Sequence, residues 1–128
     1  MMRQVAQSRV MSGTMAYHAG LAAEDIVAHD YARRGRPVAH RRWRGEAGEI
    51  DLIAREGDCV VFIEVKKSHS FDAAALRLGR RQMDRLCHAA SEFLAGEPKG
   101  QLTEMRFDVA LVDGRGAMRI IENAFGEA

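Results

Sequence analysis

The distribution of apolar residues along the chain predicts five β-strands. Runs rich in valine, isoleucine, leucine and phenylalanine are bounded by turn-forming residues, which is typical of short strands. The expected strands span residues 37–44, 49–55, 59–67, 105–112 and 117–122. Gly57 and Asp58 separate the second strand from the third and form a two-residue turn signal. These two strands are therefore expected to form a β-hairpin.

Two longer segments have the apolar period of helices that cover a sheet. The first spans about residues 12–34 and ends before Gly35 and Pro37, and the second spans about residues 73–94 after the capping residue type Asp72. The side chains expected to share an inner face are Gly20, Glu24, Val27, Ala28 and Tyr31 in the first helix, and Leu76, Met83, Leu86, Ala90 and Phe93 in the second.

These elements follow one another in the order αβββαββ, which is typical of an α/β fold with a mixed sheet. The strands at 59–67 and 105–112 are joined through a helix, so we expect them to lie parallel. The chain of 128 residues is long enough for one core. We assign residues 1–12 to a mobile tail and residues 13–128 to a single domain.

Composition excludes several classes of protein. Apolar residues make up 47% and charged residues 29% of the chain, as in ordinary soluble globular proteins. No apolar run approaches the roughly 20 residues of a membrane span, and the first residues lack the apolar stretch of a secretory signal. Cys59 and Cys87 form no disulfide framework. We therefore expect a reduced, cytoplasmic protein that does not contact a membrane.

Four charged residues interrupt the apolar pattern of the hairpin: Glu49, Asp51, Glu64 and Lys66. If the loop has two residues, Asp51 falls opposite Glu64 and Glu49 opposite Lys66, and all four side chains project to one face. Two carboxylates directly opposite each other repel, and charges are rarely buried unless they are paired or bind a metal. The pattern favours a cation between Asp51 and Glu64, whereas an ion pair with Lys66 explains Glu49 equally well.

A divalent ion, Mg²⁺ or Mn²⁺, suits this site because such ions prefer carboxylates and waters to sulfur. The ion can activate a water and stabilise charge on phosphate oxygens, while the Lys66 ammonium holds the scissile phosphate. Glu24 adds a carboxylate if its helix packs over this end of the sheet, and an ordinary helix-edge acid is the alternative. The five histidines show no paired ligand spacing, so zinc is disfavoured.

Positive charge is clustered in the chain. Six arginines and no acid lie between residues 31 and 45, around Trp43: Arg33, Arg34, Arg36, Arg41, Arg42 and Arg44. Lys67 and a later group consisting of Arg77, Arg80, Arg81 and Arg85 add to the basic set. Clustered arginine beside an aromatic residue predicts a face that binds nucleic-acid phosphates, and a solvated surface explains it equally well.

The order of these residues resembles the PD-(D/E)xK nuclease motif, since Asp51 is followed by Glu64, Val65 and Lys66. More closely, the chain is similar to the YraN-like family of small bacterial proteins, which are described as resembling Holliday-junction resolvases. The similarity covers about residues 20–125. The stretches that carry it are GLAAE (20–24), GEIDLI (48–53), VFIEVK (61–66), RFDV (106–109) and NAF (123–125).

The resemblance implies a restriction-endonuclease-like core, in which helices flank a mixed central sheet. Carried over by position, it implies that Asp51 and Glu64 bind the metal, that Lys66 is the catalytic lysine and that Glu24 is the helix acid. Gln82 falls where relatives have a lysine or glutamine facing the site.

Two positions depart from the family pattern. Ser68 stands where the family commonly has an arginine, which bears on a phosphate contact and not on the metal site. Ile50 stands where the motif name has a proline, directly before Asp51.

The sequence therefore predicts a metal-dependent nuclease that hydrolyses phosphodiesters of DNA, with branched DNA implied by the resemblance. The alternative is a nuclease-like module that binds nucleic acid or a protein without turnover. The combination of Asp51, Glu64 and Lys66 favours the enzyme, because a pure binder has no need of all three. A resolvase needs two active sites, one per strand, so a homodimer is expected.

Overall fold

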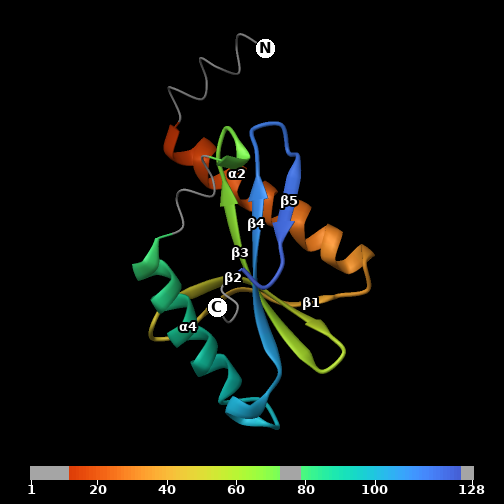
Figure 1. The fold of residues 1–128 in the computed structure, drawn as a ribbon. Coiled ribbons are helices and arrows are strands. Elements are labelled where there is room, and N and C mark those ends of the chain that lie inside the picture. Colours follow the sequence, from red (N-terminus) through yellow and green to blue (C-terminus); the bar gives the residue numbers. More distant parts are fainter. Residues whose placement is uncertain (1–11, 73–78, 125–128) are drawn as a thin grey trace.

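The computed structural model describes residues 12–72 and 79–124. The assigned tail, residues 1–12, lies outside this range except for its last residue. The elements are α2 (Ser12–Arg33), β1 (Val38–Arg44), β2 (Glu49–Glu56), β3 (Cys59–Lys67), α4 (Arg80–Leu94), the short 3₁₀ helix η1 (Gly100–Leu102), β4 (Met105–Val112) and β5 (Met118–Ile121) (Figure 1). Apart from η1, the order is the αβββαββ order expected from the sequence. None of the described helices is both long enough and apolar enough to cross a membrane.

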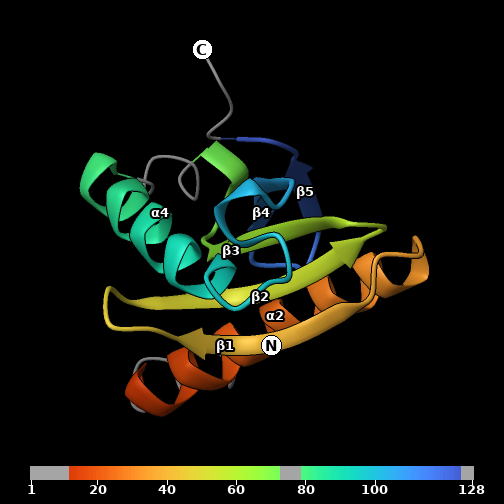
Figure 2. The same cartoon turned by 90° about the horizontal axis from the view of Figure 1, so that it is seen from below.

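The five strands form one mixed sheet in the spatial order β1-β2-β3-β4-β5. β3 and β4 run parallel, as their helical connection predicts, and the other neighbours are antiparallel. α2 covers one face of the sheet and α4 covers the other (Figure 2). The α/β class is therefore confirmed, and the arrangement agrees with a restriction-endonuclease-like core.

Each face of the sheet has its own core. On the α2 side, Val27 and Tyr31 pack with Val61 and Ile63 of β3. On the α4 side, residues of the helix pack with the intervening β3 residues Val60 and Phe62. Burial of a strand on both faces explains why β3 reads as an almost continuous apolar run rather than as an alternating one.

The second predicted helix is described only in part: Phe71 and Asp72 are helical, and helix α4 covers its later portion. α4 starts at Arg80, after Gly79, whose backbone is extended with φ −98° and ψ 164°. Glycine is a weak helix former. The prediction rested on the spacing of apolar residues, which continues across Gly79 and so does not indicate a break there. Residues 73–78, including the predicted inward-facing Leu76, lie outside the described range. The other predicted inner positions behave as expected or nearly so: Leu86, Ala90 and Phe93 are buried and Met83 is half-buried.

Candidate functional site

The hairpin between β2 and β3 has the register that its turn predicts. Gly57 adopts a positive φ of 60°, which glycine tolerates without strain. Pairing runs from Glu56 opposite Cys59 to Leu52 opposite Ile63. The described ladder ends there, one step before Asp51. From this point the Asp51 side chain contacts β3 instead, because its Oδ2 accepts a hydrogen bond of 2.8 Å from the Val65 N–H.

β2 changes face at Asp51. Leu52 belongs to the core under α2, whereas Ile50, two residues earlier, belongs to the core under α4. In a regular strand these two residues would point to the same face. The rotation between them turns the Asp51 carboxylate towards β3.

β1 changes face at the neighbouring position. Arg41 forms an ion pair with Asp25 of α2, whereas Trp43 packs edge-on against Phe93 of α4 at a centroid distance of 5.4 Å. Arg42 lies between them with a φ of 53°. This left-handed conformation is uncommon for residues other than glycine, and strained backbone tends to cluster at functional sites.

Three side chains on the α4 side of β3 form a connected group. Glu64 Oε2 lies 3.0 Å from Lys66 Nζ and accepts a hydrogen bond of 2.5 Å from Gln82 Nε2. Gln82 Oε1 in turn accepts a hydrogen bond of 3.0 Å from Lys66 Nζ. Alternation along β3 puts Glu64 and Lys66 on one face, and Gln82 reaches them from the first turn of α4. The structure therefore brings together three of the residues singled out in the sequence.

The carboxyl groups of Asp51 and Glu64 meet at the end of the hairpin ladder. Burial raises the pKa of Asp51, while the Val65 N–H and a hydrogen bond from Glu64 lower it. Burial, followed by the charge of Asp51, raises the pKa of Glu64 to about 7, although Lys66 acts in the opposite direction. Ionising both of two buried acids in contact is energetically unfavourable. The pair is therefore stabilised by a shared proton or by a bound cation.

Glu24 of α2 lies near Asp51, the β2 member of this pair. It is half-buried, and burial followed by the charge of Asp51 raises its pKa, while Arg42 lowers it. Glu49 contributes a further repulsive charge. The first helix thus brings a carboxylate near Asp51, and the role of Glu24 in the site stays a prediction.

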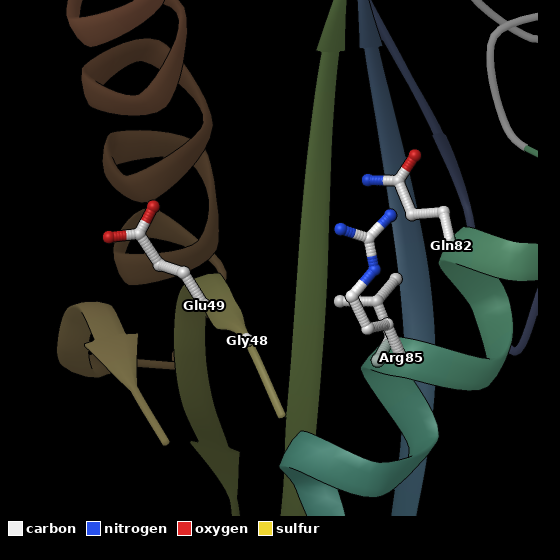
Figure 3. A pocket seen from close by; sticks show the side chains of 5 residues that line it. Gly48, Glu49, Gln82 and Arg85 are labelled. Atoms are coloured by element: carbon white, nitrogen blue, oxygen red, sulfur yellow. The ribbon is translucent and has the colours of Figure 1, made fainter. Parts of the chain in front are cut away.

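Glu49 does not form the predicted ion pair with Lys66. Its Oε2 instead lies 3.8 Å from Arg42 Nε and 3.7 Å from Arg44 Nη2. The prediction assumed that β2 and β3 remain paired up to Glu49, whereas Glu49 pairs with Arg44 across the β1–β2 ladder. Its side chain points away from Gln82 (Figure 3), although both residues line the same cavity.

The donor atoms of the site are oxygens. Within residues 12–72 and 79–124, no three histidine, cysteine or carboxylate side chains lie close enough together to hold a metal ion. Mg²⁺ is often bound by only one or two carboxylates and keeps several waters. The pair of Asp51 and Glu64, with its unfavourable buried charge, fits that mode of binding and gives no sulfur or imidazole to a softer ion.

The residues of the predicted basic face lie in separate parts of the structure. Arg41, Arg42 and Arg44 lie on β1 beside the candidate site and pair with Asp25 or Glu49. Arg33 and Arg34 lie at the other end of α2 and pair with Asp30. Lys67 ends β3 and is half-buried.

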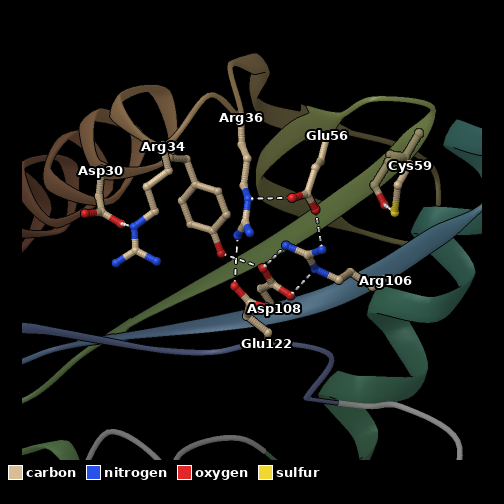
Figure 4. Close-up of polar contacts among 10 residues, drawn as sticks. Asp30, Arg34, Arg36, Glu56, Cys59, Arg106, Asp108 and Glu122 are labelled. Carbon is tan, nitrogen blue, oxygen red and sulfur yellow. Dashed lines mark hydrogen bonds and ion pairs between the residues drawn. The ribbon is translucent and has the colours of Figure 1, made fainter.

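Arg36 belongs to a polar cluster away from the carboxylate pair (Figure 4). It bridges Glu56 at 2.9 Å and Glu122 at 2.8 Å. Glu56 also accepts a hydrogen bond of 2.6 Å from Arg106. Of the six predicted phosphate-binding arginines, Arg36 is thus the one most engaged in holding the fold together.

The cluster is centred on Asp108, which is only 1% exposed. Its carboxylate accepts hydrogen bonds from Tyr31 Oη at 2.7 Å, from Arg106 Nε at 2.9 Å and from the Asn123 N–H at 3.0 Å. Asp108 therefore connects α2 to β4 and to Asn123, two residues after the end of β5. Arg106 and Asp108 are therefore members of a buried structural network.

Two residues of α4 were not placed at the site from the sequence: Arg85, which was assigned only to the later basic group, and Glu92. Arg85 lines a cavity of about 70 Å³ together with Gly48, Glu49, Gln82 and Leu86. Glu92 accepts hydrogen bonds from two backbone N–H groups of the β1–β2 loop. The signal for Arg85 was its spacing, because it lies three positions after Gln82 and so on the same side of the helix.

Comparison with known proteins agrees with the sequence resemblance. The model of Uncharacterised protein family UPF0102 matches residues 23–112. A UPF0102 protein of Cereibacter sphaeroides (strain KD131 / KCTC 12085) is 71% identical over 115 residues, which cover 90% of this chain and 98% of that protein. A UPF0102 protein of Ruegeria pomeroyi is 65% identical over 114 residues, covering 89% of this chain and 93% of that protein.

A more distant relative from Dinoroseobacter shibae is 44% identical over 119 residues, covering 93% of this chain and 89% of that protein. The family match includes the segments that carry Glu24, Asp51, Glu64, Lys66 and Gln82. It therefore spans α4 and β1 to β4 and the whole candidate site. The resemblance to the YraN-like family is confirmed, and this chain belongs to the UPF0102 family.

Proposed function

We propose that this protein is a metal-dependent nuclease that hydrolyses phosphodiester bonds of DNA, including branched DNA. The observation that carries the proposal is the meeting of the Asp51 and Glu64 carboxyl groups beside Lys66, whose ammonium lies 3.0 Å from Glu64. Perturbed acids that cluster with a cation are characteristic of catalytic sites. The cost of burying this pair is readily understood if it holds a cation during function.

Asp51 and Glu64 would hold a Mg²⁺ or Mn²⁺ ion. When bound, such an ion lowers the pKa of a water and stabilises charge on phosphate oxygens. Lys66 contacts a phosphate oxygen in this proposal, because its ammonium already donates to Glu64 and Gln82 and must lose a proton before it can serve as a base. Gln82 fixes the positions of the Glu64 and Lys66 side chains through its two hydrogen bonds. Glu24 adds negative charge from α2.

A cleavage assay tests the proposal directly. Linear, flapped and four-way DNA substrates are incubated with Mg²⁺, with Mn²⁺ or with a chelator, and products are separated on denaturing gels. Metal-dependent cleavage of any substrate that is lost in Asp51→Ala supports the nuclease. A preference for the four-way substrate supports the branched class. The absence of cleavage on all DNA and RNA substrates with both metals would remove the enzyme proposal.

The second candidate is a nuclease-like module that binds nucleic acid or a protein without turnover. It is favoured by the hydrogen bonds that engage Glu64 and Lys66 with Gln82, since a site closed by its own side chains needs no substrate to be stable. Calorimetry with Mn²⁺ distinguishes the two candidates by whether the protein binds the metal. A binding module need not take up Mn²⁺, whereas the nuclease must, and must lose it in Asp51→Ala.

Metal affinity should rise with pH because of Glu64. The pKa of about 7 means that the metal must displace a proton below neutral pH and meets an ionised carboxylate above it. Affinity for Mn²⁺ should therefore increase about tenfold between pH 6 and pH 8 if one such proton is displaced. Calorimetry at several pH values measures this increase, and Glu64→Gln should remove it. A flat profile in the wild type would contradict the role of Glu64 as a ligand.

The same raised pKa has a consequence for stability without metal. The folded protein keeps the Glu64 proton at pH values where the unfolded chain has lost it, so stability should fall as the pH rises from about 4.5, the ordinary value, to about 7. Metal that binds to the ionised pair should offset this loss at high pH. Thermal melting with and without Mn²⁺ at pH 5.5 and pH 8 gives the comparison.

Binding to DNA should depend steeply on salt and weakly on sequence, since arginines on β1 would contact phosphates. The side chains of Arg41 and Arg44 are 49% and 77% accessible. Because exposed ion pairs contribute little free energy, their carboxylate partners compete weakly with a phosphate. The double variant Arg41→Gln/Arg44→Gln should lower the salt slope by about 2. Fluorescence anisotropy between 50 and 200 mM salt measures the slope.

The double variant Lys99→Gln/Arg115→Gln, which removes two charges at exposed loop positions, is the matched control for that charge removal. Equal slopes in Arg41→Gln/Arg44→Gln and the wild type would show that these arginines do not contact phosphates.

The homodimer expected for a two-strand cleavage belongs to the same proposal. Light scattering with and without a four-way junction tests it, and a monomer on the junction would argue against paired cleavage.

A further inference from the structure

The cavity beside the candidate site is small and has one cationic wall. Its volume of about 70 Å³ corresponds to roughly two water molecules, so it accommodates a group of a few non-hydrogen atoms. Gly48 and Glu49 line it from the start of β2, and Gln82 and Arg85 line it from α4 (Figure 3). The side chains of Gln82 and Arg85 extend side by side from the helix in this view.

The loop that forms the opposite wall is held firmly on α4. Glu92 accepts hydrogen bonds from the Glu46 N–H at 2.9 Å and from the Ala47 N–H at 3.0 Å. A Cβ atom at Gly45 would lie only 2.4 Å from Glu92 Oε1, so glycine permits this close approach. The result is that Gly48 lies against Arg85, whose Cδ would be 3.6 Å from a Cβ at position 48.

Arg85 differs from the arginines of β1 in its partners. Arg41, Arg42 and Arg44 each pair with a carboxylate, and Glu49, the acid that shares the cavity with Arg85, is among those partners. Within residues 12–72 and 79–124, Arg85 has no carboxylate within ion-pair distance. Its guanidinium is exposed and three positions from Gln82, whose amide contacts both Glu64 and Lys66.

We propose that Arg85 and the adjoining Gly48 backbone form a subsite for a backbone phosphate of the nucleic acid, next to the phosphate that is cleaved. The inference rests on the proposed function and assigns a residue that it does not contain. A guanidinium offers a planar fork of N–H donors that matches phosphate oxygens, and here the fork lies beside a cavity of suitable size. Because Gln82 contacts Lys66 and lines the same cavity as Arg85, a strand bound there would reach both cations.

The test uses two variants of one helix. Arg85→Gln removes the proposed contact. Arg80→Gln removes another exposed arginine of the same basic group, which lies about 140° away round α4 and for which this proposal adopts the alternative explanation, a solvated surface. Both are measured for binding to duplex and four-way DNA in chelator, so that cleavage plays no part. Arg85→Gln should weaken binding about 5- to 20-fold and lower the salt slope by about 1, while Arg80→Gln should match the wild type and Arg85→Lys should recover part of the affinity.

Nuclear magnetic resonance with inorganic phosphate gives an independent reading. The Arg85 Nε–Hε signal should shift on titration more than that of Arg80 in the wild type. If Arg85→Gln and Arg80→Gln bind DNA equally, the subsite is refuted while the nuclease proposal stands. If the wild-type protein binds neither DNA nor RNA at low salt, the proposed function fails and the subsite fails with it. Thermal melting of each variant verifies that it is folded.

Discussion

Replacing Lys66 by alanine is expected to lower the cleavage rate about 100- to 1000-fold, the typical loss when one electrostatic contact to the transition state is removed. Metal binding should survive, because an ammonium is not a metal ligand. Lys66 donates to Glu64 and to Gln82, and the same Nζ is the only part of the side chain that carries charge. The lower cleavage rate of Lys66→Ala should therefore come mainly from the lost charge contact and not from unfolding.

Asp51→Ala provides the contrast. It removes a carboxylate that faces Glu64 and accepts the Val65 N–H, so metal binding and cleavage should be lost together. Calorimetry with Mn²⁺ and single-turnover cleavage are measured on both variants. Lys99→Ala, at an exposed loop position far from the site in the chain, is the control for loss of a lysine.

The pH must be chosen with Glu64 in mind. Without Lys66 the pKa of Glu64 should rise further, since the lysine charge is one of the factors that lower it. Measurements at pH 8 or above favour the ionised form of Glu64 more than measurements at neutral pH, in Lys66→Ala as in Asp51→Ala. Equal loss of metal binding in Lys66→Ala and Asp51→Ala at that pH would identify Lys66 as a structural partner of the carboxylates and not as a catalytic group.

The register of the hairpin could be read from the sequence because a local feature determines it. A two-residue turn leaves one way to pair the flanking strands, and the alternation of side chains then brings Asp51 towards Glu64. The predicted bounds of β3 and β4 agree with the structure for a related reason. Their long apolar runs are bounded by glycine, serine and charged residues.

The partners of Glu49 could not be read in the same way. They depend on the end of the β2–β3 ladder and on the change of face at Asp51 and Arg42, where the backbone of an ordinary arginine adopts a positive φ. No residue type at position 42 signals that conformation, since glycine or asparagine would be expected there. It occurs where β1 changes face, between Arg41, which contacts α2, and Trp43, which contacts α4.

The arginine cluster shows a second limit. A charge run identifies a basic segment, but the carboxylates that neutralise it come from distant positions, such as Asp25 for Arg41 and Glu122 for Arg36. Only the fold shows that Arg36 supports a polar cluster while Arg41 and Arg44 lie beside the candidate site. Arg85 stood in a different basic segment and is brought to the site by α4.

Asp108→Ala is expected to cost about 3–5 kcal/mol of folding stability, as is usual when one member of a buried ionic group is removed. The change would leave Arg106 with one carboxylate fewer and Tyr31 Oη without its buried acceptor. Burial, together with its hydrogen bond to Asp108, raises the pKa of Tyr31, so the hydroxyl stays a donor that needs a partner. Chemical denaturation followed by circular dichroism measures the loss.

Two further variants show where that stability resides. Asp25→Ala breaks the exposed pair with Arg41, whose side chains are 66% and 49% accessible, and should cost at most about 1 kcal/mol. Tyr31→Phe keeps the ring and removes one hydrogen bond, so its cost should fall between the other two at about 1–3 kcal/mol. A loss in Asp108→Ala no larger than that in Asp25→Ala would contradict a stabilising role for the cluster. Because Asp108 contacts α2 seven residues beyond Glu24, the folded fraction of Asp108→Ala should still bind Mn²⁺, which separates its effect from that of Asp51→Ala.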